Sequence, residues 1–202
     1  MPWKSCRNRS ITGKISAKAP DPEHKRGETV ENNNQIPVPV KPAKSEYSDF
    51  FQSYIDLVES EDVAEALKED QREMMSFIAD LPEDKLEFAY NEGKWTTREV
   101  ILHVTKSEVW FSNQVRQIAG VPIPEHFNNI GDSLEQAQNR SQIRESFQEI
   151  REASIQVFEN LKPELFSQTV PEAKYQISAL AHGFLIAGHS THHAKVIRER
   201  YL

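Results

Sequence analysis

The chain has 202 residues with 31 acidic side chains, 24 basic side chains, a formal net charge of −7 and a single cysteine. This length allows one large domain or a smaller domain with an attached tail. An acidic chain without a basic stripe disfavours nucleic-acid binding, and the absence of an apolar run of about 18 residues excludes a membrane-spanning helix.

Residues 1–45 differ in composition from the rest of the chain. They contain nine Lys or Arg and four Asp or Glu, a net of +5, which leaves −12 for the remaining 157 residues. They also contain most of the prolines and a run of three asparagines, and no apolar stretch that would offset the entropy of ordering. We therefore expect a disordered tail over residues 1–45 and a folded domain over residues 46–202.

The first twenty residues are basic, as in transit peptides, but no amphipathic apolar face accompanies the charge. No apolar segment typical of a secretory signal is found either, so we expect a cytoplasmic protein. The only cysteine, Cys6, lies in the predicted tail. An intrachain disulfide and a cysteine nucleophile in the folded part are thereby excluded.

After Ser45 the apolar residues recur at helical spacing, which predicts an all-α fold. A first helical stretch is expected from about Tyr47 to Ala79, with a break near Ser60 as an alternative. A second helix is expected to begin after Thr96, which forms a capping box with Glu99, and to end at Gly120.

Residues 121–140 form a long polar connection, with a short helix after Ser133 as an alternative. A third helix is expected over about Ser141 to Leu161, and a fourth from a Ser178 cap to the C-terminus. Four helices with one long connection between the second and third predict a four-helix bundle with one crossover.

Three histidines on two of these helices suggest a metal site. His189 and His193 are one turn apart on the core side of the fourth helix, so both imidazoles can reach one ion. Such a pair alone is a weak signal, since core or surface histidines show the same spacing. His103 lies on the flank of the apolar stripe of the second helix and can face the pair. Three imidazoles would leave coordination positions open, as catalytic sites do.

Glu108 and His192 are the two catalytic candidates. Glu108 falls inside the apolar stripe of the second helix, where an unpaired carboxylate is costly. A hydrogen bond to a ligating imidazole, or a bond to an arginine or a helix end in the core, would satisfy it, and we favour the structural option. His192 can act as a base, as an orienting group or as an ordinary helix residue, and is not expected to be a ligand.

The remaining histidines and the tryptophans are weaker candidates. We expect His182 to have a capping or surface role near the start of the fourth helix, with the mouth of a pocket as the alternative. His24 and His126 have no partner at a useful spacing. Trp95 and Trp110 are expected to pack in the core, and Trp110 is the better candidate for a pocket wall.

Two blocks of the sequence carry a family resemblance. Residues 93–103 (GKWTTREVILH), followed by Glu108, resemble the start of the second helix in the DinB-like superfamily of metal-binding four-helix bundles. Residues 179–202 resemble the last helix of that superfamily, particularly of its YfiT-like branch. The resemblance implies that His103, His189 and His193 bind a divalent ion, commonly nickel or zinc, with iron or manganese as alternatives.

The resemblance also implies an activity. Family members include thiol-dependent S-transferases, which join a low-molecular-weight thiol such as bacillithiol or mycothiol to a small electrophile, the two partners expected here. A metal-dependent hydrolase and a non-catalytic protein for metal binding or assembly are the alternatives, and the oligomeric state stays open, a homodimer included. Many members have an acid three positions after the first histidine, where this chain has Lys106, so the role of that acid is absent or displaced.

Overall fold

The computed structural model of the chain describes residues 40–128, 136–171, 173 and 175–202. The disorder expected for residues 1–39 and the start of the alternative short helix after Ser133 fall on residues outside these ranges. No helix of the described part is long and apolar enough to cross a bilayer.

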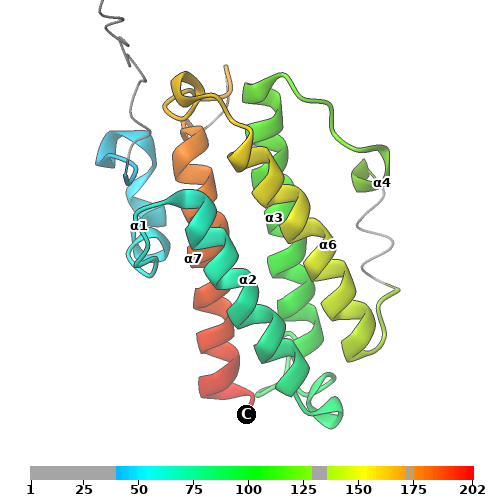
Figure 1. The fold of residues 1–202 in the computed structure, drawn as a ribbon. Helices are drawn as coiled ribbons and strands as arrows, with labels where there is room; N and C mark the ends of the chain where they lie inside the picture. The colour runs from blue at the N-terminus through cyan, green and yellow to red at the C-terminus, as the bar shows by residue number, and fades with distance from the viewer. Residues whose placement is uncertain (1–39, 129–135, 172, 174) are drawn as a thin grey trace, which may run out of the picture. The chain divides into compact units, whose positions relative to one another are not determined.

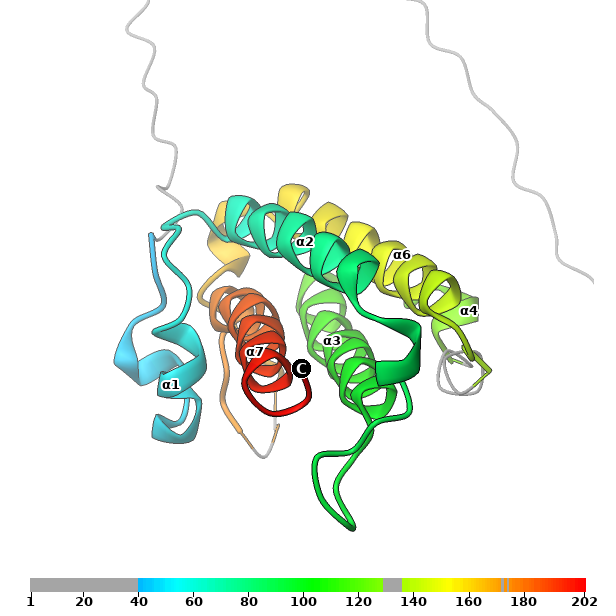
Figure 2. The ribbon, with the colours of Figure 1, turned by 90° about the horizontal axis from the view of Figure 1, so that it is seen from below.

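Four long helices form the bundle: α2 (Val63–Asp80), α3 (Thr97–Ala119), α6 (Arg140–Glu159) and α7 (Ala179–Arg200). Helix α7 packs against α2 and α3, and α6 packs against the same two helices from the other side. The four helices therefore close into a ring around one core, as Figure 2 shows from below. The predicted all-α four-helix bundle is confirmed.

The order of the helices explains the long connection between α3 and α6. In Figure 1 these two helices run in the same direction, so the chain must return along the length of the bundle between them. The short helix α4 (Glu125–Asn128) lies on this return path. The predicted crossover is confirmed.

The predicted caps are present. The hydroxyl of Thr96 accepts a hydrogen bond from the backbone N–H of Glu99, and the Glu99 carboxylate accepts one from the N–H of Thr96. The hydroxyl of Ser178 accepts from the N–H of Ala181 at the start of α7. Gly120 ends α3 with a φ of 67°, a left-handed conformation that glycine adopts without strain.

The first helical stretch is broken, which confirms the alternative near Ser60. Helix α1 covers only Gln52–Ile55 and packs against α7, and α2 begins at Val63. Asp62 caps α2, and the hydroxyl of Ser60 accepts from the N–H of Asp62, so these side chains start a new helix. The remaining helical turns are of the 3₁₀ type: Lys44–Glu46, Asp49–Phe51, Glu83–Lys85 and Pro163–Leu165.

Residues 40–45, which we assigned to the tail, contact the folded part. The ammonium group of Lys41 donates to the carbonyl of Val58 at 2.8 Å, and Pro42 is buried. Directly afterwards, the backbone N–H of Ser178 donates to the carbonyl of Glu46. Residues 41–46 are therefore held against the folded part, and Glu46 is bonded to the start of α7.

The apolar core consists of two clusters that are separated by buried polar side chains. One cluster contains Leu67 and Leu185, and the other contains Met74 and Ala194. Four polar side chains, one on each bundle helix, are connected by hydrogen bonds: the buried Asp70, Glu108 and Arg151 and the half-buried Thr191. We call these four residues the polar layer.

Candidate metal centre

The three predicted ligands converge between α3 and α7. His103 is on α3, His189 and His193 are one turn apart on α7, and these two helices pack against each other. One ligand atom from each of the three side chains lies within 4.8 Å of the others, so the group can hold a metal ion.

The ring geometry fits two ligands of one ion. Nε2 of His193 and Nε2 of His189 are 3.1 Å apart. Two nitrogens that each lie about 2.1 Å from a shared ion, at angles between 90° and 109°, are roughly 3.0–3.4 Å apart. The ring centroid of His103 lies 5.0 Å from that of His189 and 5.1 Å from that of His193, which brings the third imidazole to the same point.

Burial keeps these imidazoles neutral. The pKa of His189 is lowered to about 3, first by burial and then by the neighbouring His193, His103 and His192. The pKa of His193 is lowered to about 4, again mainly by burial, and burial also lowers the pKa of His103. Neutral imidazole is the form that coordinates a metal, so the three donors are ready at neutral pH.

An aromatic wall from α1 covers the triad on one side. The ring of Tyr54 makes edge-to-face contacts with His189 at 5.5 Å and with His192 at 5.2 Å. This approach requires a glycine on α7, because a Cβ atom at Gly188 would overlap the backbone carbonyl of Tyr54. No periodic pattern marked Tyr54, because it lies on the four-residue helix α1 after two short turns.

His192 lies beside the triad and is not one of its ligands in this geometry. Its ring centroid is 5.1 Å from that of His193, and the metal-binding group comprises only His103, His189 and His193. His192 thus lies next to the triad with its ring against Tyr54.

Glu108, one of the two catalytic candidates, pairs with an arginine in the core. Its two carboxylate oxygens accept from Nε and Nη2 of Arg151 at 2.8 and 2.9 Å, and both side chains are fully buried. Arg151 also donates to Asp70 at 2.5 Å. Burial opposes the charge on Arg151, but the two carboxylates outweigh it and hold its pKa above the ordinary value. Of the two kinds of partner predicted for Glu108, the arginine in the core is the one found.

A pocket of about 390 Å³ opens beside the triad on the α3 side. His103 forms part of its wall together with Trp95, Arg98, Glu99, Leu102 and Lys106. Trp95 is 51% exposed and its ring lies 4.9 Å from that of His103. The expectation that Trp95 packs in the core is wrong, because the residue precedes α3 and covers a ligand from outside.

His182 does not have the surface role expected for it, and it lines a pocket, which was the alternative. It is buried rather than at the surface, and its Nδ1 lies 2.8 Å from the carbonyl oxygen of Ser178. The ring of Phe111 connects it to the triad, at 5.9 Å from His182 and 6.3 Å from His189. Its spacing of seven residues before His189 was the available signal, since two turns keep both residues on the same side of α7.

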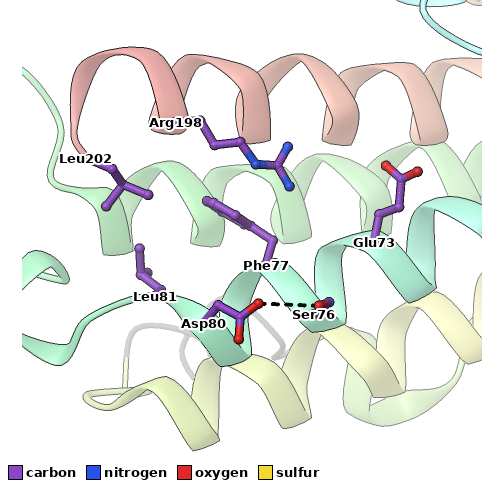
Figure 3. Close-up of a pocket in the computed structure, with 7 residues that line it drawn as sticks. All are labelled: Glu73, Ser76, Phe77, Asp80, Leu81, Arg198 and Leu202. Carbon is purple, nitrogen blue, oxygen red and sulfur yellow. Dashed lines mark hydrogen bonds between the residues drawn. The ribbon is translucent and has the colours of Figure 1, made fainter.

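A further pocket, of about 410 Å³, lies between the C-terminal ends of α2 and α7 (Figure 3). The guanidinium of Arg198 covers the ring of Phe77 at 4.7 Å, and Ser76 and Asp80 on the next turns of α2 are joined by a hydrogen bond. None of the seven lining residues is a histidine or belongs to the triad, and we assign it no part in the candidate site.

Comparison with known proteins identifies one family. The model of the DinB superfamily matches residues 66–197, a range that contains His103, His189 and His193. No curated protein and no solved structure matches the chain.

Proposed function

Because the chain belongs to the DinB superfamily and its three imidazoles converge, we propose that it binds one divalent ion through His103, His189 and His193. The observation that carries this proposal is the 3.1 Å separation of the His189 and His193 Nε2 atoms within a group of neutral imidazoles. Imidazole donors suit nickel and zinc, with iron and manganese as alternatives.

We further propose that the reaction is thiol-dependent S-transfer. The sulfur of a low-molecular-weight thiol forms a bond to an electrophilic carbon, the bond from that carbon to its leaving group breaks, and the thiol proton is released. When bound, the ion would supply the positive charge that lowers the pKa of a thiol into the neutral range. The resemblance to thiol transferases supports this choice of reaction.

Side chains around the triad can perform the other parts of the reaction. We assign His192, which borders His193 and Tyr54, the role of accepting the thiol proton. The pocket against His103 provides room for a cosubstrate, and Trp95 forms its apolar wall. Glu108 has no role in this scheme because Arg151 occupies both of its oxygens.

One experiment tests both steps. Metal in the untagged, full-length protein is measured by elemental analysis, and a panel of thiols is assayed against a chlorinated dinitrobenzene for the thioether product. We expect about one ion per chain, and transfer that is lost with the ion. Stoichiometric metal without transfer from any thiol would contradict the reaction and favour hydrolysis or a non-catalytic role. Protein without metal after supplementation with nickel and with zinc would contradict the site.

A further inference from the structure

A third pocket borders α3 and α7 two turns away from the triad. It has a volume of about 420 Å³, within the range of small-molecule sites. Trp110 lies seven residues after His103 on α3, and His182 lies seven residues before His189 on α7. Because the two helices are antiparallel, both residues lie at one level, about 10 Å along the bundle from the triad.

The walls of this pocket are mainly apolar and aromatic, and Gln114 contributes a polar side chain beside His182. Trp110 and Tyr175 are each 51% exposed, which is unusual for such large side chains, and Ile177 and Val170 form the buried part of the wall. The expectation that Trp110 packs in the core is therefore wrong, and the pocket-wall alternative is the one found. A flat ring can stack between such side chains.

His182 adds one fixed polar atom to this apolar wall. Its side chain is 97% buried, since its exposed fraction is 3%, and it belongs to the lining of the pocket. A carbonyl oxygen can only accept, so Nδ1 must donate to Ser178 and the proton of the neutral ring lies there. Nε2, on the opposite edge of the ring, is then an acceptor, and no hydrogen bond reaches it from the described residues.

We propose that this pocket binds a flat, largely apolar molecule with one hydrogen-bond donor, which Nε2 of His182 accepts. We also propose that the molecule is the electrophilic acceptor of the transfer reaction, a step that rests on the proposed function. Phe111 contacts both His182 and His189, so one buried ring separates the pocket from the triad. An acceptor held at its donor end by His182 would reach the ion past the edge of this ring.

Binding is tested with two probes on the full-length protein, p-cresol and 4-methylanisole, which differ in whether the oxygen carries a proton. We expect p-cresol to bind about three- to tenfold more tightly, the value of one hydrogen bond. Addition of p-cresol should also move the nitrogen resonance of His182 Nε2. Equal affinities for the two probes, or an unchanged resonance, would overturn the proposal.

Variants locate the binding site. His182→Asn keeps a donor for the Ser178 carbonyl and removes Nε2, so it should abolish the preference for p-cresol. Trp110→Ala should weaken both probes about three- to tenfold through lost stacking. Trp95→Ala, which changes an equally exposed tryptophan at the other pocket, is the matched control and should leave both affinities unchanged. Weaker binding in Trp95→Ala with unchanged binding in Trp110→Ala would overturn the assignment, and this pair of variants decides even if His182→Asn does not fold.

Kinetics separate this inference from the proposed function. With metal content unchanged, Trp110→Ala and His182→Asn should raise KM for a phenolic acceptor and leave KM for the thiol as it is. Transfer with an unchanged acceptor KM would overturn the acceptor assignment alone. Selective p-cresol binding in a protein that transfers no thiol would instead contradict the proposed reaction. The assignment of the pocket as a binding site would then still hold.

Discussion

The triad histidines combine two properties that a metal ligand needs: their side chains converge, and their rings are neutral. The same burial that lowers the pKa of His189 to about 3 also removes the water that would otherwise satisfy its ring. Nδ1 of His193 is a further example, because it is buried and has no hydrogen-bond partner in the described part. Buried polar atoms without partners are costly, and a bound ion would compensate this cost by fixing both rings.

Replacing any triad histidine by alanine should reduce metal content sharply, as measured by elemental analysis after dialysis. Double variants should lose little more than single ones, because the loss of one ligand of three already disrupts the site. The melting temperature gives a second readout, since a ligand of the folded state stabilises by about 2.7 kcal/mol at a hundred times its dissociation constant. Chelator should therefore lower the melting temperature of the wild type and leave those of the variants nearly unchanged.

His192→Ala is the informative control for this series. We expect full metal content and impaired thiol transfer, as for a group that moves a proton. Metal loss equal to that of His193→Ala would show that the ligand set was assigned to the wrong neighbour. Stoichiometric metal in all three triad variants would remove the basis of the proposed function.

His182 should make stability depend on pH. Burial lowers its pKa to about 4, against the opposing effect of its bond to Ser178, whereas the unfolded value is about 6.5. Below pH 6.5 the unfolded chain therefore binds more protons at this residue, and the folded state loses stability as the pH falls toward 4. The slope is at most about 1.4 kcal/mol per pH unit for one histidine.

Urea unfolding of metal-free wild type and His182→Asn, at pH values between 4 and 8, measures this contribution. The unfolding free energy of the wild type minus that of His182→Asn should be constant above pH 6.5. It should decrease as the pH falls below 6.5. Because the other histidines are common to both proteins, their titration cancels. A difference that does not change with pH would mean that His182 is protonated equally in both states.

Among the helices, the polar layer fixes how four elements meet. Arg151 on α6 joins Glu108 on α3 to Asp70 on α2, and the second oxygen of Asp70 accepts from Thr191 on α7 at 3.1 Å. Thr191 lies between His189 and His193, so this bond also sets the position of the ligand turn of α7. We interpret the layer as a structural device that aligns the ligands without touching a substrate.

Arg151→Met should destabilise the protein by roughly 3–5 kcal/mol, because two carboxylates would remain buried without their partner. Glu108→Gln should cost less, about 1–3 kcal/mol. Both should retain metal in the folded protein, which separates a structural Glu108 from a catalytic one. Glu152→Gln, an exposed change on the same helix as Arg151, should stay within about 0.5 kcal/mol in the same denaturation assay.

The contact between α1 and α7 predicts the effect of Gly188→Ala. Helix propensity alone would make this change stabilising by about 1 kcal/mol. The overlap with the Tyr54 carbonyl should instead make it destabilising by roughly 1–3 kcal/mol, since α1 has to move. The side-chain resonances of His189 and His192, which contact Tyr54, should shift as well. A gain in stability would show that α1 is not held at this distance.

Helix positions followed from the sequence because caps and apolar spacing are local signals. The Thr96 capping box, the Gly120 end and the Ser178 cap all lie where the pattern placed them. What the sequence could not show is which side chains meet across helices. Glu108 was visibly out of place on an apolar stripe, and its partner Arg151, 43 residues away, lies one turn after Phe147 on the apolar face of its own helix, but nothing in either pattern showed that the two would meet. His182 was misplaced for the same reason, since its burial depends on Phe111 and on the segment that contains Ile177.

For the molecule as a whole, the contacts of the described residues with the bundle begin within the segment predicted as tail. Tyr47 is buried and its hydroxyl donates to Gln52, and Glu46 accepts from the start of α7. The boundary at residue 45 came from the numbers of charged residues and prolines, which describe residues 1–45 as a whole. These numbers could not detect that Lys41 and Pro42, at the end of that segment, contact the bundle.

Two truncations test where the folded part begins. Removal of residues 1–39 should leave the melting temperature and the metal content of the protein unchanged, because this segment offers no apolar anchor. Removal of residues 1–47 should lower the unfolding free energy by about 2–4 kcal/mol, through the lost burial of Tyr47 and the unpaired N–H of Ser178. Tyr47→Ala in the full chain should reproduce most of that loss. Equal stability of both truncations would place the limit after residue 47, and a loss on removing residues 1–39 would show that the basic segment contributes to the fold.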